Sequence, residues 1–198
     1  MYHLAHYRPC QTPGCPRAAL HAADHCARHL PDPAAFRRAV ERLAREEGLD
    51  GANLEEAGLA GVVLATARLA GANLTRCNLE GANLEAATLR RALAPGANLR
   101  RADLRGARCE LVVLGGATLD GARCDDADLR RANLVGVSAE DARFDRADLY
   151  YARLGTAHLA RASFAEANIQ RAIFRAADLR GAHLESAKGT ANFDRAVR

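Results

Sequence analysis

The chain has 198 residues, of which 49% are hydrophobic and only 5% aromatic, and its formal net charge at pH 7 is +4. That charge is too small to indicate a nucleic-acid partner by itself, no apolar run approaches the roughly 18 residues of a membrane span, and the N-terminal sequence MYHLAHYRPC lacks the apolar core of a signal peptide. We therefore expect a cytoplasmic protein with no membrane segment, whose narrow core is built mainly from alanine and leucine.

Cysteine and histidine residues crowd the start of the chain. Four residues separate Cys10 from Cys15, and two separate Cys26 from His29. Two close pairs joined by a short loop supply the four tetrahedral ligands that zinc requires, and thiols crowded in a reducing compartment favour a metal over disulfides. The spacing resembles the small Cys3His zinc fingers of treble-clef type that are attached to various bacterial nucleic-acid proteins. Since protein side chains fill all four positions, the zinc is expected to be structural.

His29 is the expected fourth ligand, because a helix that begins at Cys26 would place residues three apart on one face, although the sequence alone leaves other histidines open. His21 and His25 are alternatives to His29, while His3 and His6 are less favoured. The cluster also has a plainer interpretation, in which the thiols merely lie close together and the histidines belong to a solvated loop. We favour zinc because so short a segment has too few apolar residues to fold unaided. On this interpretation residues 1–31 form a zinc-finger-like module.

A helix is expected over residues 32–48. Asp32 is suited to the N-cap, Pro33 to the first helical position and Gly48 to the C-terminal stop. One face of this helix is apolar and can cover the open end of the next segment, where bare strand edges would invite aggregation. The residues on that face are Phe36, Val40 and Leu43. We therefore interpret the segment as a capping helix.

A five-residue repeat runs from residue 51 to residue 187 without insertion or deletion. From Ala52 to Ala187, positions numbered with a final 2 or 7 are alanine except Val62, Cys77, Val112 and Val137, and two places later leucine, phenylalanine or isoleucine predominates. An α-helix would rotate successive leucines by about 140°, and a continuous strand would turn each to the opposite face. The pattern fits three extended residues and a two-residue corner, with alanine and leucine inward and four units per coil.

The units ANLTR, ANLEA, ADLRG and ADLRR resemble the A(D/N)LXX motif of the pentapeptide repeat family. The resemblance implies an all-β solenoid over residues 49–198, a right-handed quadrilateral β-helix of about seven coils. With strands about 4.8 Å apart, the rod would be roughly 34 Å long. Three cysteines at inward positions are expected to be buried packing residues. They are Cys77, Cys109 and Cys124.

The C-terminal end of the repeat departs from its own pattern. One residue is lost after Leu184, in SAKGTANFDRA, and Gly189 occupies a core position. The last coil is therefore expected to be irregular. No second capping helix follows, and related proteins of the family dimerise through this end. The resemblance thus suggests a homodimer formed near Phe193, the alternative being an end that tolerates its exposure.

The outward positions, sorted by coil side, predict one basic and partly aromatic side and one acidic side. On the basic side the candidates for binding a partner are Arg90, Arg91, Arg130, Arg131, Tyr150, Tyr151 and Arg171. The acidic side carries Glu85, Asp103, Asp125, Asp126, Asp145, Glu166 and Glu185, which nearby arginines partly offset. The alternative interpretation is that these charges only keep a narrow rod soluble and form cross-coil pairs.

The repeat offers little support for catalysis. His158 and His183 lie at outward positions on different sides, with no nucleophile beside either. We expect instead a non-catalytic interaction protein, a rigid scaffold that presents a zinc finger and charged flanks to a protein partner.

Two other functions stay open. Quinolone-resistance members of the resembled family imitate the width and negative charge of duplex DNA and protect or inhibit DNA gyrase, a topoisomerase. This chain departs from them in its basic balance. The second alternative is direct nucleic-acid binding through the finger and the arginine-rich side, which would be steeply salt-dependent.

Overall fold

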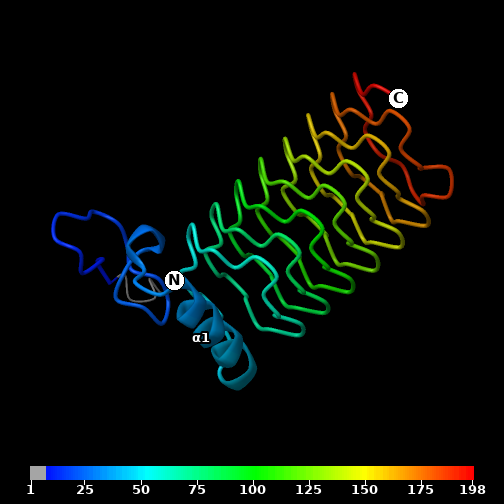
Figure 1. The fold of residues 1–198 in the computed structure, drawn as a ribbon. Coiled ribbons are helices and arrows are strands. Elements are labelled where there is room, and N and C mark those ends of the chain that lie inside the picture. The colour runs from blue at the N-terminus through cyan, green and yellow to red at the C-terminus, as the bar shows by residue number, and fades with distance from the viewer. Residues whose placement is uncertain (1–7) are drawn as a thin grey trace.

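The protein is a straight stack of coils with a small module and one helix at its N-terminal end (Figure 1). This architecture is taken from a computed structural model, which describes residues 8–198. Its helical elements are a 3-10 helix, η1, at Ala27–His29 and an α-helix, α1, at Pro33–Glu46. The extended pieces of the coils pair through single parallel bridges, so they form ladders along the rod instead of long strands.

Each coil pairs with the next at a spacing of 20 residues, as Asn53 does with Asn73. The Leu54 N–H donates to the Asn73 carbonyl at 2.8 Å, and the Asn73 N–H donates to the Ala52 carbonyl at 2.9 Å. Within a coil, the Ala57 N–H donates to the Leu54 carbonyl at 3.1 Å and closes the corner. These bonds confirm the expected unit of an extended piece and a two-residue corner.

The spacing shortens at the C-terminal end, as the lost residue predicts. Asn168 still pairs with Lys188, but Ile173 pairs with Asn192, which is one residue early. Apolar residues of this last coil are only partly buried, Phe193 among them. Its ring stacks on that of Phe174 at 5.1 Å. Within residues 8–198 no element covers this end (Figure 1).

The core is a column of inward alanines and leucines, which are almost fully buried from Ala52 to Leu179. The inward cysteines behave as packing residues, because all three are buried. Burial raises the pKa of the Cys77 and Cys109 thiols to about 12, so they stay protonated at neutral pH. Of the helices in residues 8–198, none is long and apolar enough to cross a membrane.

Helix α1 lies against the first coil and meets its unpaired backbone groups. Phe36 and Val40 are buried in the same apolar cluster as the coils. The Val63 N–H, which has no preceding coil to bond, donates to Glu41 Oε1 at 3.2 Å. Arg37 Nη1 donates to the Ala60 carbonyl at 2.9 Å. Side chains of the helix thus satisfy groups that a neighbouring coil would otherwise bind.

The sequence explains the bounds of α1. Asp32 Oδ1 accepts a hydrogen bond from the Ala35 N–H at 2.8 Å, and Pro33 opens the helix. At the other end Gly48 has a φ of +88°, and its N–H bonds the Leu43 carbonyl at 2.8 Å. The expected cap residues at both ends therefore act as such.

The second corner residue of most units has a positive φ, which favours glycine, yet many of these positions hold other residues. Ala86 has a φ of 54°, whereas Gly81 has a φ of +62° and open space where a methyl group would stand. We expect Ala86→Gly to raise the free energy of unfolding and Gly81→Ala to lower it, each by about 1 kcal/mol, because only a side chain strains this backbone. Guanidinium denaturation measures both, and equal destabilisation by the two variants would contradict the expectation.

Candidate metal centre and charged surfaces

Three cysteine sulfurs and one histidine nitrogen converge in the N-terminal module. Sγ of Cys10 and Sγ of Cys26 each lie 3.5 Å from Nδ1 of His29, and Sγ of Cys15 lies 3.9 Å from Sγ of Cys26. All four ligand atoms fall within 4.8 Å of one another. A tetrahedral zinc with ordinary bond lengths would separate two sulfurs by about 3.8 Å and a sulfur and nitrogen by about 3.6 Å. The cluster therefore has the donors and the dimensions to hold a metal ion.

Two short local structures bring these ligands together. Pro9 and Ala18 form an antiparallel bridge, and the Cys15 N–H donates to the Thr12 carbonyl at 3.1 Å in the turn between them. Gly14 has a φ of +73° there, which a residue with a side chain rarely adopts. The turn thereby folds the second cysteine of the pair back beside the first.

Helix η1 positions the other pair of ligands. The His29 N–H donates to the Cys26 carbonyl at 3.0 Å, which closes a turn of 3-10 type. Residues three apart in such a turn point the same way, so Cys26 and His29 share one side. The histidine in the cluster is thus His29, and neither His21 nor His25 belongs to it. His3 and His6 lie outside the described residues.

The environment of Cys10 favours its thiolate. Burial raises the pKa of this thiol, but hydrogen bonds from the backbone of Cys26 and Thr12, and then from the His29 ring, outweigh burial and lower the pKa to about 5. The side chain is 6% exposed. The surroundings of Cys10 thus both bury its sulfur and donate hydrogen bonds that stabilise the negative charge of the thiolate.

The module is fastened to the first coil through Glu56. Arg17 Nη1 lies 2.7 Å from Glu56 Oε2, and Arg28 and Arg76 add ion pairs at 3.3 and 2.8 Å. The hydrogen bond from Arg17 is the main reason that the pKa of Glu56 is lowered. In addition, the His21 N–H donates to the Asn53 carbonyl at 2.7 Å. That bond takes the place of one from a preceding coil.

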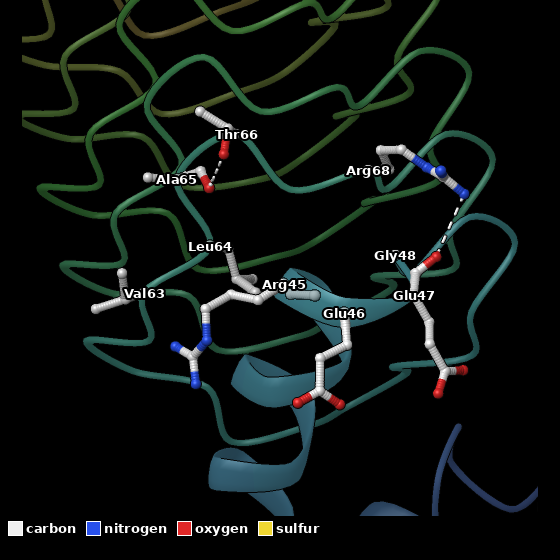
Figure 2. A pocket seen from close by; sticks show the side chains of 10 residues that line it. Arg45, Glu46, Glu47, Gly48, Val63, Leu64, Ala65, Thr66 and Arg68 are labelled. Atoms are coloured by element: carbon white, nitrogen blue, oxygen red, sulfur yellow. Dashed lines mark hydrogen bonds between the residues drawn. The ribbon is translucent and has the colours of Figure 1, made fainter.

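A hollow lies between the end of α1 and the first coils (Figure 2). Arg68 Nη2 spans it to donate to the Glu47 carbonyl at 3.3 Å, and Arg68 Nε also binds Asp50 at 2.9 Å. The Thr66 hydroxyl donates to the neighbouring Ala65 carbonyl at 2.7 Å. These groups are occupied with the protein itself, so the hollow does not form a nucleophile and base pair.

The basic side divides into paired and unpaired arginines. Arg90 Nη2 lies 2.6 Å from Glu110 Oε2, and Arg130 Nη2 lies 2.7 Å from Asp128 Oδ2. By contrast, Arg91 and Arg131 are exposed and have no carboxylate partner within residues 8–198. The remaining candidates form one small cluster.

That cluster contains Tyr150, Tyr151 and Arg171. The two tyrosine rings meet edge to face at 4.6 Å between centroids. The Arg171 guanidinium lies over the Tyr151 ring at 5.1 Å and donates a hydrogen bond to its hydroxyl. No carboxylate in the described chain neutralises Arg171.

On the acidic side, arginines neutralise most of the carboxylates. Arg143 Nη2 lies 2.9 Å from Asp125 and 3.0 Å from Asp145, both of which are nearly buried. Arg105 pairs with Asp103 at 2.6 Å, and the remaining pairs are Glu85 with Arg105, Asp126 with Arg146 and Glu166 with Lys188. Only Glu185 of this side has no ion pair in the part of the chain that the structure describes. The side is therefore less negative than its carboxylates alone suggest.

Comparisons with known proteins agree on the repeat. The family model described as pentapeptide repeats matches in 8 copies, over residues 49–85, 82–121, 107–146, 122–159, 142–181 and 157–188. A search of the curated proteins gives no match.

Several solved structures are similar. HetL, a pentapeptide repeat protein involved in heterocyst differentiation regulation from the cyanobacterium Nostoc sp. strain PCC 7120, is 27% identical over 76% of this chain and 82% of its own, with a TM-score of 0.34. The pentapeptide repeat protein Rfr23 from the cyanobacterium Cyanothece 51142 is 28% identical over 50% of this chain and 63% of its own, with a TM-score of 0.29. Full-length QnrB1, a plasmid-mediated fluoroquinolone resistance protein, is 15% identical over 73% of this chain and 80% of its own, with a TM-score of 0.34.

The buried carboxylate of Asp145 provides a pH test of the ion pair with Arg143 in its own coil and of the hydrogen bonds from the next coil. Burial raises its pKa, but bonds from Ser163, the Ala165 N–H and Arg143 outweigh burial and lower it. Asp145→Asn should therefore lower the free energy of unfolding by about 1–3 kcal/mol at pH 7. Because the folded pKa lies below the unfolded one, this stabilisation is present above about pH 4 and is lost as the pH falls through the folded pKa.

Urea denaturation between pH 7 and pH 2 measures the difference in the free energy of unfolding between the wild type and Asp145→Asn. Glu185→Gln is the matched control, since that carboxylate is exposed and unpaired in the described chain, and its effect should stay within about 0.5 kcal/mol. A constant gap between Asp145→Asn and the wild type over this pH range would show that the ionised pair does not stabilise the fold.

Proposed function

The chain belongs to the pentapeptide repeat family, and on that premise we propose that it is a non-catalytic interaction protein. Proteins of this family fold as right-handed β-helices. In the proposed function, a rigid quadrilateral rod of about seven coils presents a zinc-bound module and charged flanks to a partner protein. The observation that carries the proposal is that Arg91 and Arg131 are exposed and have no carboxylate partner among residues 8–198, whereas most other arginines of the rod form ion pairs. Arg101, Arg108 and Arg153 also lack such a pair, but they lie on other columns of the rod.

The proposed domain organisation follows from the contacts at the N-terminal end. Residues 1–31 form the zinc module, 32–48 the capping helix and 49–198 the β-helix. The module and helix are proposed to act jointly as the cap, because His21 and Glu41 each bond a backbone group of the first coil. The cytoplasm is the proposed compartment, since the module depends on reduced thiols.

Zinc is the proposed metal, held by Cys10, Cys15, Cys26 and His29. Their sulfur and nitrogen atoms are the donors that zinc prefers, and their separations match a tetrahedron. When bound, the ion would supply a structural crosslink and no reactive position, because four protein ligands complete its shell. The residues themselves tie the turn at Gly14 to helix η1, which fixes the module on the rod.

The metal content tests this assignment. The purified chain should carry one zinc per molecule, and Cys10→Ser or His29→Gln should lower that content at least about tenfold, because each removes a ligand. His21→Gln is the matched control and should keep full occupancy. Mass spectrometry of the metal and circular dichroism of the same samples give the result. Full zinc in His29→Gln would refute the ligand set, as would metal-free wild type after growth with zinc.

Partner capture tests the function as a whole. Immobilised wild type should retain one specific protein from native extract, and His29→Gln should lose it while its β-helix signal is unchanged. Unfolding of the entire rod in His29→Gln would instead restrict the zinc to a stabilising role. Equal capture by both proteins would remove the module from the binding function, and the absence of any specific protein would count against the scaffold itself.

Gyrase modulation by DNA mimicry is a weaker candidate. Mimicry requires an exposed negative surface, whereas Asp103, Asp126 and Asp145 are neutralised by neighbouring arginines. We therefore expect gyrase supercoiling to be unchanged at micromolar excess of the protein. Inhibition, or protection from a quinolone, would restore this candidate.

A homodimer through the C-terminal end also remains a proposal. Phe193 is only half-buried there, and the Arg198 guanidinium lies over its ring at 4.2 Å. A second copy would cover both the ring and the unpaired backbone edge of the last coil. Light scattering decides the question, since a monomer mass at micromolar concentration would remove the proposal.

A further inference from the structure

One corner of the rod carries a row of side chains that we name the arginine edge. It comprises Arg91, Leu111, Arg131, Tyr151 and Arg171. All five occupy the same second corner position in successive coils, with φ between 56° and 62°. Consecutive coils are joined here by backbone bonds such as Leu111 N–H to the Arg130 carbonyl at 3.0 Å. The row therefore runs straight along the rod.

At the equivalent corner of other sides most arginines are neutralised, whereas Arg101, which has Gly81 one coil back, has no ion pair in the described chain. Arg76 pairs with Glu56, Arg146 with Asp126 and Arg161 with Asp141, each one coil back and at 2.7–2.8 Å. On the arginine edge the residue one coil back is glycine, leucine or tyrosine, so no such pair can form. The positive charge of this edge is consequently free to meet an outside carboxylate.

Apolar side chains flank the charges on the adjoining side of the rod. Leu93 is 47% exposed and Ile173 is 37% exposed, although both are large hydrophobic residues. Leu93 and Val113 line a shallow groove together with Arg91 and Leu111. A second groove places Ile173 beside Arg153, which also has no ion pair in the described chain. Charged and apolar side chains thus adjoin in both grooves, Arg91 beside Leu93 in the first and Arg153 beside Ile173 in the second.

The spacing of the arginines limits the shape of a ligand. Arg91, Arg131 and Arg171 are two coils apart, which is about 9.6 Å for parallel strands 4.8 Å apart. A polyproline II segment has three residues per turn and a rise of 3.1 Å, so every third side chain recurs at about 9.3 Å on one face. An ordinary β-strand would turn every third side chain to the opposite face.

We propose that the arginine edge binds an acidic segment of the partner protein in polyproline II conformation, with a carboxylate at about every third residue and apolar residues between. The guanidinium groups pair with the carboxylates, and Leu93 and Ile173 cover the apolar residues. Single-stranded nucleic acid fits less well, because its phosphates would face this apolar flank and the edge-to-face packing of Tyr150 on Tyr151 occupies one face of the available rings. This inference rests on the proposed scaffold function and specifies its partner.

Fluorescence anisotropy with a labelled peptide, five repeats of Glu-Pro-Leu, tests the proposal. The wild type should bind it, and binding should weaken between 50 and about 200 mM salt. The triple variant Arg91→Gln, Arg131→Gln, Arg171→Gln should weaken binding at least about tenfold. The matched control removes three other exposed arginines without ion pairs in the described chain, namely Arg38, Arg45 and Arg101, each changed to Gln. It should bind within about twofold of the wild type.

Further probes separate a peptide site from a general polyanion site. The Gln-Pro-Leu peptide should not bind, and Leu93→Ser should weaken the Glu-Pro-Leu peptide. Equal losses in the two triple variants, or tighter binding of a 15-nucleotide oligo-dT than of the peptide, would overturn the proposal. So would the absence of peptide binding. If wild type and the Arg91, Arg131, Arg171 variant capture the same cellular partner equally, this inference fails while the scaffold function stands.

Discussion

The rest of the structure depends on the backbone hydrogen bonds that join each coil to the next, in a register that places bridge partners 20 residues apart. Bonds such as Leu54 N–H to the Asn73 carbonyl hold neighbouring coils a strand spacing apart. At that spacing the inward leucines of successive coils stack into ladders, and the inward alanines line the wall beside them. An inserted residue would break the pairing with both adjacent coils. The register accordingly stays intact until the last coil, where pairing is needed on one side only.

The same bonds create a problem at the ends, because the first and last coils have no neighbour on one side. At the N-terminal end, groups of different origin supply the missing partners: the Glu41 side chain, the Arg37 side chain and the His21 backbone. The Cys-His cluster lies within the segment that contributes His21. A metal ion bound there would act on the end of the rod through this backbone bond without touching the coils.

The sequence predicts the features that follow from the five-residue period. It does not predict which side chains contact one another, because those contacts depend on local turns and on side-chain conformation. Inward residues, corners and the lost residue near Gly189 follow from counting. Cysteine spacing predicts a cluster, but the choice of His29 depends on a 3-10 turn that spacing alone does not define. The sequence predicts that cross-coil pairs can form but assigns no partners, although a simple signal exists: an acid 20 residues before a corner arginine, as Asp126 stands before Arg146. The sequence does not single out Arg153 as an unpaired arginine, because Arg153 is not at a corner position and the acid-to-arginine spacing does not apply to it.

Unpaired arginines at one corner of the rod repel one another, and the spacing of the arginine edge reduces this repulsion. They forgo a cross-coil ion pair, and like charges on adjacent coils would repel at about 5 Å. Leu111 and Tyr151 separate the arginines of the edge so that neighbours lie about 9.6 Å apart, beyond the Debye length of about 8 Å at physiological ionic strength. Repulsion between exposed groups is then largely screened. A carboxylate in direct contact with one guanidinium, beside a desolvated leucine, is screened much less. The alternation therefore lowers the repulsion within the rod while it preserves the attraction for a ligand.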